Sequence, residues 1–263
     1  MIDLTRLTVS EIKKYVNDYP PDEQVLEQLA ADGRAGVRRI YHLIQNKREK
    51  LLREYQRLEK LFTYEQQLFS QGKKYIVGID EVGRGPLAGP VVAGAVIFPK
   101  DVVIHGLNES KKVSAAKRRK LAKEIKEKAV AWSLGLATVQ EINRFNIYQA
   151  TLLAMRRAVG KLSTRPEHLL VDAVNIPGIN IPQFAIKGGD RLSGSIAAAS
   201  IIAKTYRDEM MQNYHKKYPR YQFDRHKGYP TKEHLEALKK YGPSPIHRSG
   251  YAPVAELIKD KLF

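Results

Sequence analysis

The segment 73–98, KKYIVGIDEVGRGPLAGPVVAGAVIF, constrains the fold more than any other part of the chain. Two apolar runs, 75–79 and 91–98, stand on either side of a short glycine-rich connection, and such runs predict an antiparallel pair of strands. The first run ends in two adjacent acids, Asp80 and Glu81. The segment therefore predicts a sheet that carries carboxylates where a strand leaves the core.

Further apolar runs predict three more strands, and the segments between them predict helices. The strands are expected at 133–139 (SLGLATV), 168–174 (HLLVDAV) and 183–190 (QFAIKGGD), and the main helices at 114–132, 146–162 and 193–217. Ser114 is a suitable N-cap for the first of these helices. Strands that alternate with helices in this way predict a mixed α/β sheet flanked by helices.

The first 72 residues differ from the rest in period and in charge. Segment 20–33 has the Pro/Asp start and Gly stop of a short helix, and 34–69 has apolar residues at the spacing of one or two amphipathic helices. Residues 1–72 hold 12 Lys/Arg against 11 Asp/Glu, whereas 73–263 hold 33 against 17. We therefore expect an N-terminal helical extension, 1–72, and a basic α/β domain, 73–263, whose last part, roughly 219–263, forms C-terminal helices.

Composition limits the kind of partner and the kind of site. A formal net charge of +17 favours an anionic partner such as nucleic acid. The absence of cysteine excludes disulfides and thiolate metal sites, and the seven histidines lack zinc-ligand spacing. The start of the chain has no signal-peptide pattern, and no apolar run approaches the roughly 20 residues that span a bilayer. A soluble, cytoplasmic protein is expected.

Four acids are associated with the predicted strands: Asp80, Glu81, Asp172 and Asp190. A carboxylate among Ile, Val and Leu costs several kcal/mol to bury without a partner. An arginine or lysine could compensate any one of them, but convergence of four acids favours a divalent cation, and oxygen ligands suit Mg²⁺ or Mn²⁺. Two such ions are a common means of cleaving a phosphodiester. Because neighbouring strand residues point to opposite faces, Glu81 must reach round or the strand must bulge near Gly83.

Five motifs, in this order, give the chain a resemblance to prokaryotic ribonuclease HII: GIDEVGRGPLAGPVVAGAV, ESKKVS, LLVDAV, IKGGDRLSGSIAAASIIAKTYRD and HKGYPTKEH. The resemblance covers about 75–235. It implies a ribonuclease H-like fold with a five-stranded mixed sheet, and Mg²⁺ or Mn²⁺ as cofactor. The implied activity is cleavage of the RNA strand of RNA/DNA hybrids, and incision 5′ of single ribonucleotides in duplex DNA, leaving 5′-phosphate and 3′-hydroxyl ends. Asp80, Glu81, Asp172 and Asp190 match the family's metal-binding, catalytic acids.

The resemblance also implies residues that bind the substrate. Gly83, Arg84 and Gly85 match an element that senses the ribose 2′-OH, the group that distinguishes RNA from DNA. Glycines allow close approach of a backbone to a sugar, although they could also serve only a tight turn. Tyr229 matches a tyrosine that packs against the sugar, and its alternative role is to anchor a loop.

Basic residues supply the remaining implied contacts. Ser110, Lys111 and Lys112 match a segment near the substrate phosphates, although a lysine pair is commonly only a solvated surface. On the helix 193–217, Lys204 either meets a phosphate or neutralises a neighbouring acid. The sequence departs from the family pattern at Ala173, where glycine was expected, and in the additional glycine of KGGD.

Two other functions remain open at this point. A binding protein for hybrids would share the positive charge but gives no reason to keep four acids near phosphate. Another nuclease of the same fold, of the resolvase or transposase kind, would explain the acids but not the Gly-Arg-Gly element. The partners expected are RNA/DNA hybrid and ribonucleotide-containing duplex DNA, with no membrane, and the chain is expected to be a monomer.

Overall fold

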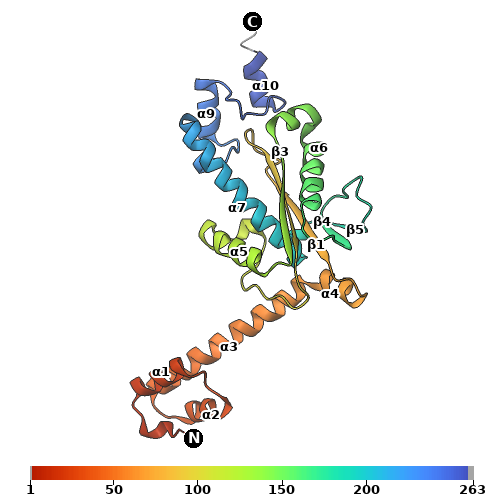
Figure 1. Ribbon diagram of the computed structural model, residues 1–263. Coiled ribbons are helices and arrows are strands. Elements are labelled where there is room, and N and C mark those ends of the chain that lie inside the picture. Colours follow the sequence, from red (N-terminus) through yellow and green to blue (C-terminus); the bar gives the residue numbers. More distant parts are fainter. Residues whose placement is uncertain (1, 260–263) are drawn as a thin grey trace. The chain divides into compact units, whose positions relative to one another are not determined.

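The computed structural model describes residues 2–259 (Figure 1). The chain divides into two compact units, Met1–Arg57 and Leu58–Phe263. This division falls within the long helix 35–61, earlier than the expected boundary between residues 72 and 73. The expected boundary stays a prediction.

The first unit is helical, as its periodicity predicts. Its elements are η1 (Leu4–Arg6), α1 (Val9–Asp18), α2 (Glu23–Ala31) and most of α3 (Ala35–Leu61). At the start of α1, the Thr8 hydroxyl accepts the Glu11 N–H and the Glu11 carboxylate accepts the Thr8 N–H, which is a capping box. Ile12, Leu29 and Val37 are fully buried, so three helices share a small core of their own.

The second unit contains a five-stranded sheet, and the predicted mixed α/β architecture is confirmed. In the order β3-β2-β1-β4-β5, β1 is antiparallel to β2 and parallel to β4. The strands are β1 (Ile76–Val82), β2 (Val91–Ile97), β3 (Ala131–Ala137), β4 (His168–Asp172) and β5 (Gln183–Ile186). The central strand β1 thus lies between β2, which follows it directly in the chain, and β4, which is reached by a longer crossover connection.

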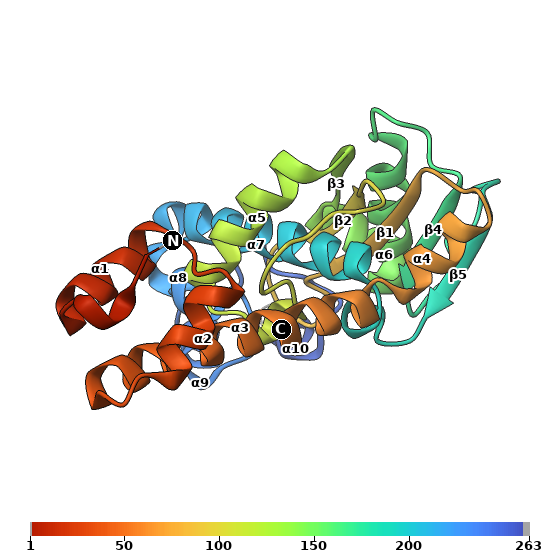
Figure 2. The ribbon, with the colours of Figure 1, turned by 90° about the horizontal axis from the view of Figure 1, so that it is seen from below.

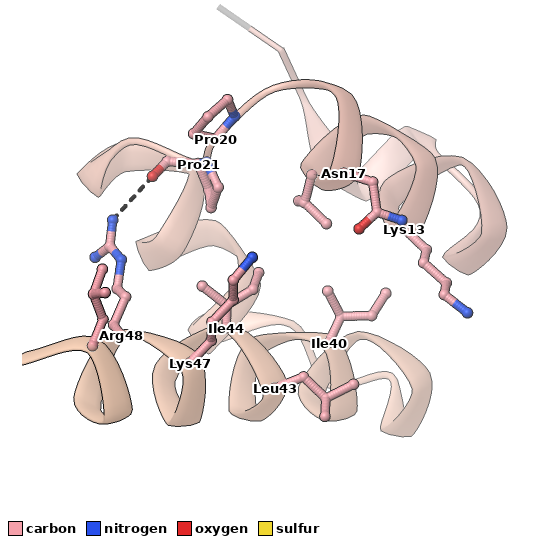
Figure 3. A pocket seen from close by; sticks show the side chains of 11 residues that line it. Lys13, Asn17, Pro20, Pro21, Ile40, Leu43, Ile44, Lys47 and Arg48 are labelled. Carbon is pink, nitrogen blue, oxygen red and sulfur yellow. Dashed lines mark hydrogen bonds between the residues drawn. The ribbon is translucent and has the colours of Figure 1, made fainter. Parts of the chain in front are cut away.

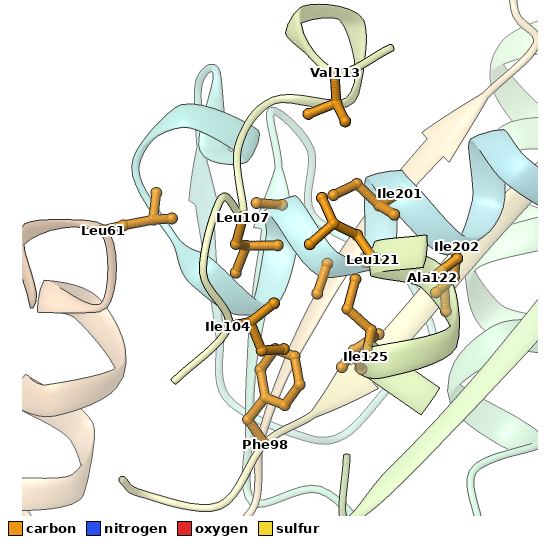
Figure 4. Packing of buried hydrophobic residues seen from close by; sticks show 14 of the residues in the cluster. Leu61, Phe98, Ile104, Leu107, Val113, Leu121, Ala122, Ile125, Ile201 and Ile202 are labelled. Carbon is orange, nitrogen blue, oxygen red and sulfur yellow. The ribbon is translucent and has the colours of Figure 1, made fainter. Parts of the chain in front are cut away.

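Helices cover both faces of the sheet (Figures 1 and 2). Along β2, Ala95 and Ile97 face α6 (Val139–Gly160), whereas Val96 faces α5 (Ala115–Lys128) and α7 (Gly194–Lys217). This alternation follows the two-residue period of a strand. Figure 4 shows the α5–α7 side, where leucine, isoleucine and phenylalanine side chains from several elements form one cluster.

A short helix, α4 (Thr63–Ser70), supports the start of α7. The Glu65 carboxylate accepts the Ser193 hydroxyl at 2.6 Å and the Ser195 N–H at 2.8 Å. Burial raises the pKa of Glu65, although both hydrogen bonds oppose that rise. An acceptor at a helix N-terminus satisfies N–H groups that have no partner within the helix.

The chain ends in short helices, as expected for roughly 219–263. These are η4 (Pro219–Tyr221), α8 (Phe223–His226), α9 (Lys232–Tyr241) and α10 (Ala252–Lys259). They enclose three histidines: the rings of His226 and His234 stack at 4.4 Å, and His234 Nε2 lies 3.0 Å from His247 Nε2. Burial lowers the pKa of His234 to about 4 and that of His247 to about 3, so both are neutral core residues at pH 7.

Element bounds differ from the sequence prediction at several places. β3 spans Ala131–Ala137 rather than 133–139, so Trp132 belongs to this strand, and α5 ends earlier than expected, at Lys128. β1 continues beyond Ile79 and carries both acids, whereas the apolar run alone placed them after the strand. β5 ends at Ile186, so Asp190 lies on the following 3-10 helix η3 (Gly189–Arg191) rather than on the strand. Helix α6 begins seven residues early, at Val139, and breaks at Asn146, whose φ is +69°.

Candidate metal centre

Three of the four predicted acids converge at one edge of the sheet. Asp80 and Glu81 lie near the end of β1, and Asp172 ends the neighbouring parallel strand β4. The register pairs Ile79 with Val171, so the next residues, Asp80 and Asp172, lie side by side on neighbouring strands. One carboxylate oxygen from each acid lies within 4.8 Å of the others.

Glu81 joins this group without a bulge in the strand. The register of β1 and β2 runs unbroken through Glu81 and Val82, so no bulge lies at or before the two acids. Of the two alternatives considered, a bulge or a side chain that reaches round, the second remains. The Glu81 N–H donates to Asp80 Oδ1 at 2.7 Å, and the Glu81 carboxylate lies 3.4 Å from Arg84 Nη1. The longer glutamate side chain therefore reaches round at the end of the strand.

The electrostatics of the group favour binding of a cation. Asp80 is 5% exposed, and burial raises its pKa well above the usual value, with Glu81 and Asp172 raising it further. Burial likewise raises the pKa of Glu81, and Arg84 only partly offsets this. Acids that are buried close together resist full ionisation unless a positive charge is supplied.

Asp190 lies beside this group but is not one of the three. Burial raises its pKa, and the charges of Asp172 and Glu109 raise it further, while Lys111 and Arg191 lower it. Asp190 is thus close enough to Asp172 for their charges to interact. Glu109 stands next to the Ser-Lys-Lys motif, and sequence reasoning did not assign it to the site.

The two departures from the family pattern concern the backbone around Asp172. Ala173 takes the left-handed conformation, with φ +58°, at the position where glycine was expected. In KGGD, Gly188 is also left-handed, and the Gly189 N–H donates to Asp172 Oδ1 at 2.7 Å. A side chain at Gly189 would meet Ile196 at 2.6 Å, so this second glycine lets the backbone reach the carboxylate.

A pair of serines connects the helix α7 to the acids. Ser200 makes a hydrogen bond that lowers the pKa of Asp80, and its hydroxyl lies 2.9 Å from that of Ser110. Ser110 is buried, whereas Lys111 and Lys112 are exposed. Ser200 stands four residues before Lys204 on α7, which puts the two on one face of the helix, but this spacing alone does not indicate which acid Ser200 would meet.

Lys204 is already paired. Its Nζ lies 2.7 Å from Asp208 Oδ1, and Asp208 also lies 3.3 Å from Arg118 Nη2. Burial lowers the pKa of Lys204. Of the two roles considered for Lys204, neutralisation of a neighbouring acid is the one present in this conformation.

The Gly-Arg-Gly element follows directly on the acids. The Arg84 side chain is 46% exposed, and Gly85 is open on one side, where a Cβ would meet only Tyr229 Cε1 at 3.6 Å. Tyr229 is itself 38% exposed. The structure thus brings Tyr229 to the glycine loop although Tyr229 comes 144 positions after Gly85 in the sequence.

A separate apolar groove lies in the first unit, between α1 and α3 (Figure 3). Ile40, Leu43 and Ile44 line it, and Lys13 and Lys47 stand at its rim. Because no acid and no histidine lines it, it offers no carboxylate or imidazole to a metal ion, and none of the four predicted acids lies in it. Across residues 2–259, no helix is both long enough and apolar enough to span a membrane.

Comparison with known proteins agrees with the fold and the motifs. The family model of ribonuclease HII matches residues 77–254, and that of the ribonuclease HII N-terminal domain matches 8–69. A ribonuclease HII of Pelotomaculum thermopropionicum is 53% identical over 251 residues, 94% of each chain. One from Myxococcus xanthus is 51% identical over 240 residues, 91% of this chain and 82% of the other.

A solved structure confirms the fold independently of close sequence similarity. The crystal structure of ribonuclease H2 from Pyrococcus horikoshii OT3 superposes with a TM-score of 0.62 at 24% identity, covering 71% of this chain and 98% of that one. The family models cover the sheet, the acids and the N-terminal helices, and the relatives extend over nearly the whole length. The chain belongs to the ribonuclease HII family and is a nuclease of the hydrolase class.

Proposed function

We propose that this chain is a metal-dependent endoribonuclease that cleaves the RNA strand of RNA/DNA hybrids and incises duplex DNA 5′ of a single ribonucleotide. The products carry 5′-phosphate and 3′-hydroxyl ends. The observation that carries the proposal is the convergence of Asp80, Glu81 and Asp172 within 4.8 Å, next to a glycine loop that a sugar can approach. Membership of the ribonuclease HII family supports it.

The donor set fits a hard divalent cation, Mg²⁺ or Mn²⁺. All donors are carboxylate oxygens, which these ions prefer. Among residues 2–259, no lysine or arginine forms an ion pair with Asp80 or Asp172, and only Arg84 pairs with Glu81. Asp80, Glu81, Asp172 and Asp190 are the residues that would hold the metal. When bound, two ions would supply activation of the attacking water and stabilisation of the leaving 3′ oxygen.

The surrounding residues orient these carboxylates. Ser200 holds Asp80 by a hydrogen bond, and the Gly189 N–H holds Asp172. The Ser200 hydroxyl favours the ionised form of Asp80, because it donates to oxygen, and the Gly189 N–H fixes the orientation of the Asp172 carboxylate. Lys111 and Arg191 add positive charge near Asp190. This charge would reduce the electrostatic repulsion between the four acids and a phosphate of the substrate.

The substrate contacts are assigned by position around the acids. Gly83, Arg84 and Gly85 would sense the 2′-OH, and Tyr229 would pack against the sugar at the same place. The exposed Lys111 and Lys112 would contact phosphates, with Ser110 holding their turn in place. Lys204 would contact a phosphate only after leaving Asp208.

The test is a single assay on duplex DNA with one internal ribonucleotide, with Mg²⁺ or Mn²⁺ added. We expect incision on the 5′ side of the ribonucleotide and none in EDTA. Binding without incision would instead indicate a hybrid-binding protein, and cleavage of junctions made only of DNA would indicate a resolvase-like enzyme. We also propose that the active species is a monomer, since the acids and Tyr229 all come from one chain, and sedimentation measurements test this.

A further inference from the structure

Two arginines, Arg207 and Arg248, are fully buried behind the loop that joins β1 to β2. Within residues 2–259 neither forms an ion pair with an acid, although Asp208 adds some favourable charge near Arg207. Burial lowers the pKa of Arg207 to about 10, and it lowers the pKa of Arg248 as well. Burial of a guanidinium without a carboxylate partner costs free energy. The groups to which each guanidinium donates therefore indicate its role.

Both guanidinium groups donate to backbone carbonyls of this loop. Arg248 donates to the carbonyls of Gly83 at 2.6 Å, Arg84 at 2.9 Å and Gly89 at 2.8 Å, and its Nη1 also lies 3.0 Å from the Tyr251 hydroxyl. The Tyr251 hydroxyl in turn donates to the Arg84 carbonyl at 2.6 Å. Arg248 therefore connects the start of the loop, at Gly83 and Arg84, to its end, at Gly89. These two parts are called the first and the second limb of the loop.

Arg207 fixes the second limb and connects it to the segment before Tyr229. It donates to the carbonyls of Ala88 and Pro90, at 3.1 and 3.0 Å, and to that of Lys227 at 3.1 Å. The loop and the Tyr229 segment are also joined directly, through the Leu87 N–H and the Gly228 carbonyl at 2.8 Å. The glycine loop and Tyr229 are thus held by one buried scaffold.

The orientation of two peptide units follows from these bonds. All peptide bonds of the described residues are trans, and in a trans unit the N–H points away from the C=O. Because the carbonyls of Gly83 and Arg84 point inward to Arg248, the N–H groups of Arg84 and Gly85 point outward. Neither has an acceptor among residues 2–259, and both residues are exposed.

Gly83 and Gly85 face opposite sides of the loop: Gly83 faces the buried Arg207, and Gly85 faces the exposed side near Tyr229. Gly83 has φ +100°, and a Cβ there would collide with Arg207 Nε. At Gly85, in contrast, a Cβ would only touch Tyr229. Gly83 thus makes room for the buried arginine, and Gly85 leaves the outer face free for a ligand.

We propose that Arg248, assisted by Tyr251 and Arg207, is a positioning residue for ribonucleotide specificity: it holds two peptide units so that their N–H groups face the ribose 2′ oxygen. This rests on the proposed function of the Gly83–Gly85 element. Arg248 touches no substrate, and it acts through the backbone alone. Its fork of five donors is needed, because an ammonium group cannot reach carbonyls on both limbs of the loop at once.

The experiment compares incision at a ribonucleotide with incision at a 2′-fluoro nucleotide in the same duplex, under single-turnover conditions. Fluorine is a poor hydrogen-bond acceptor, so the ratio of the two rates reports on donation to the 2′ oxygen. We expect Arg248→Lys to lower this ratio about tenfold or more, and Tyr251→Phe to lower it about two- to threefold. The matched control is Arg157→Lys, since Arg157 also donates to a carbonyl, that of Leu136, but lies away from the loop.

A second readout separates positioning from general damage. Trp132, the single tryptophan, lies on β3, so its fluorescence follows unfolding of the second unit. Stabilisation of this unit by Mn²⁺ should be the same in all variants, because the acids are untouched. A folded Arg248→Lys protein with the wild-type ratio would overturn the inference; should that variant not fold, a wild-type ratio in Tyr251→Phe would overturn it equally. If the wild-type protein itself lacks the preference, the proposed 2′-OH sensor fails, and the inference fails with it.

Discussion

Replacement of Asp80 by asparagine should make the metal-free protein more stable while it abolishes cleavage. Asp80 is almost fully buried, and its carboxylate lies within 4.8 Å of those of Glu81 and Asp172. At an effective dielectric constant of about 20, two unit charges at that distance repel by about 3 kcal/mol. Asparagine has the same size and removes one of the three charges.

The net gain is smaller than the repulsion, because the raised pKa of Asp80 already lets a proton relieve part of it. We expect an increase of about 1–3 kcal/mol in the free energy of unfolding at neutral pH, which for a unit of this size corresponds to about 3–10 °C in Tm. The sign with pH follows from the raised pKa. The folded wild-type protein binds this proton more tightly than the unfolded chain, so its stability falls as pH rises through the raised pKa. Asp80→Asn should lose less stability over that range.

The measurement is thermal unfolding followed by Trp132 fluorescence, in EDTA and with Mn²⁺, across pH. Metal should stabilise the wild-type protein and should stabilise Asp80→Asn little, while binding of hybrid persists. Asp101→Asn is the control, since Asp101 is exposed and lies in a turn away from the acids. A variant that is less stable than wild type in EDTA, or that still cleaves, would refute the reasoning.

Three further sets of substitutions test the surroundings of the site. Arg84→Ala should change the free energy of unfolding by less than about 0.5 kcal/mol, because its side chain is about half exposed and forms only a partly solvated ion pair, but it should weaken discrimination of ribonucleotides in the incision assay. Gly83→Ala should destabilise the protein by about 2–4 kcal/mol, through its positive φ and the collision with a buried arginine, whereas Gly85→Ala should leave denaturant unfolding almost unchanged and reduce incision. Glu65→Ala should cost about 1–3 kcal/mol, since two buried donors lose their acceptor, and Glu65→Gln, which keeps an acceptor oxygen, should cost less in the same titration.

The local elements could be predicted because their signals are local. Ser114 caps α5 as expected, with its Oγ accepting the Lys117 N–H. Apolar runs located all five strands, and the acids stood out because a carboxylate beside Ile and Val needs an explanation. The predictions that failed were also local: Asp190 follows a short strand that ends at Ile186, since the glycines of KGGD turn the chain first. The start of α6 was missed because the capping box of Thr138 and Glu141 precedes a break at Asn146.

The support of the site could not be predicted, because it depends on residues distant in sequence. Arg207 and Arg248 resemble any other basic residues of a chain with a net charge of +17. Only their burial behind the glycine loop distinguishes them. The same holds for Ser200, whose hydroxyl meets Asp80 because α7 packs closely on β1.

The sequence by itself determined the residue types of the candidate metal centre, the mixed sheet and the family, since periodicity and motifs are carried by neighbours along the chain. The tertiary structure decided which acids share one site, how Glu81 reaches it from an unbroken strand, and which way the peptide units of the glycine loop face. These depend on distances between elements, and packing sets such distances only when the whole domain has folded.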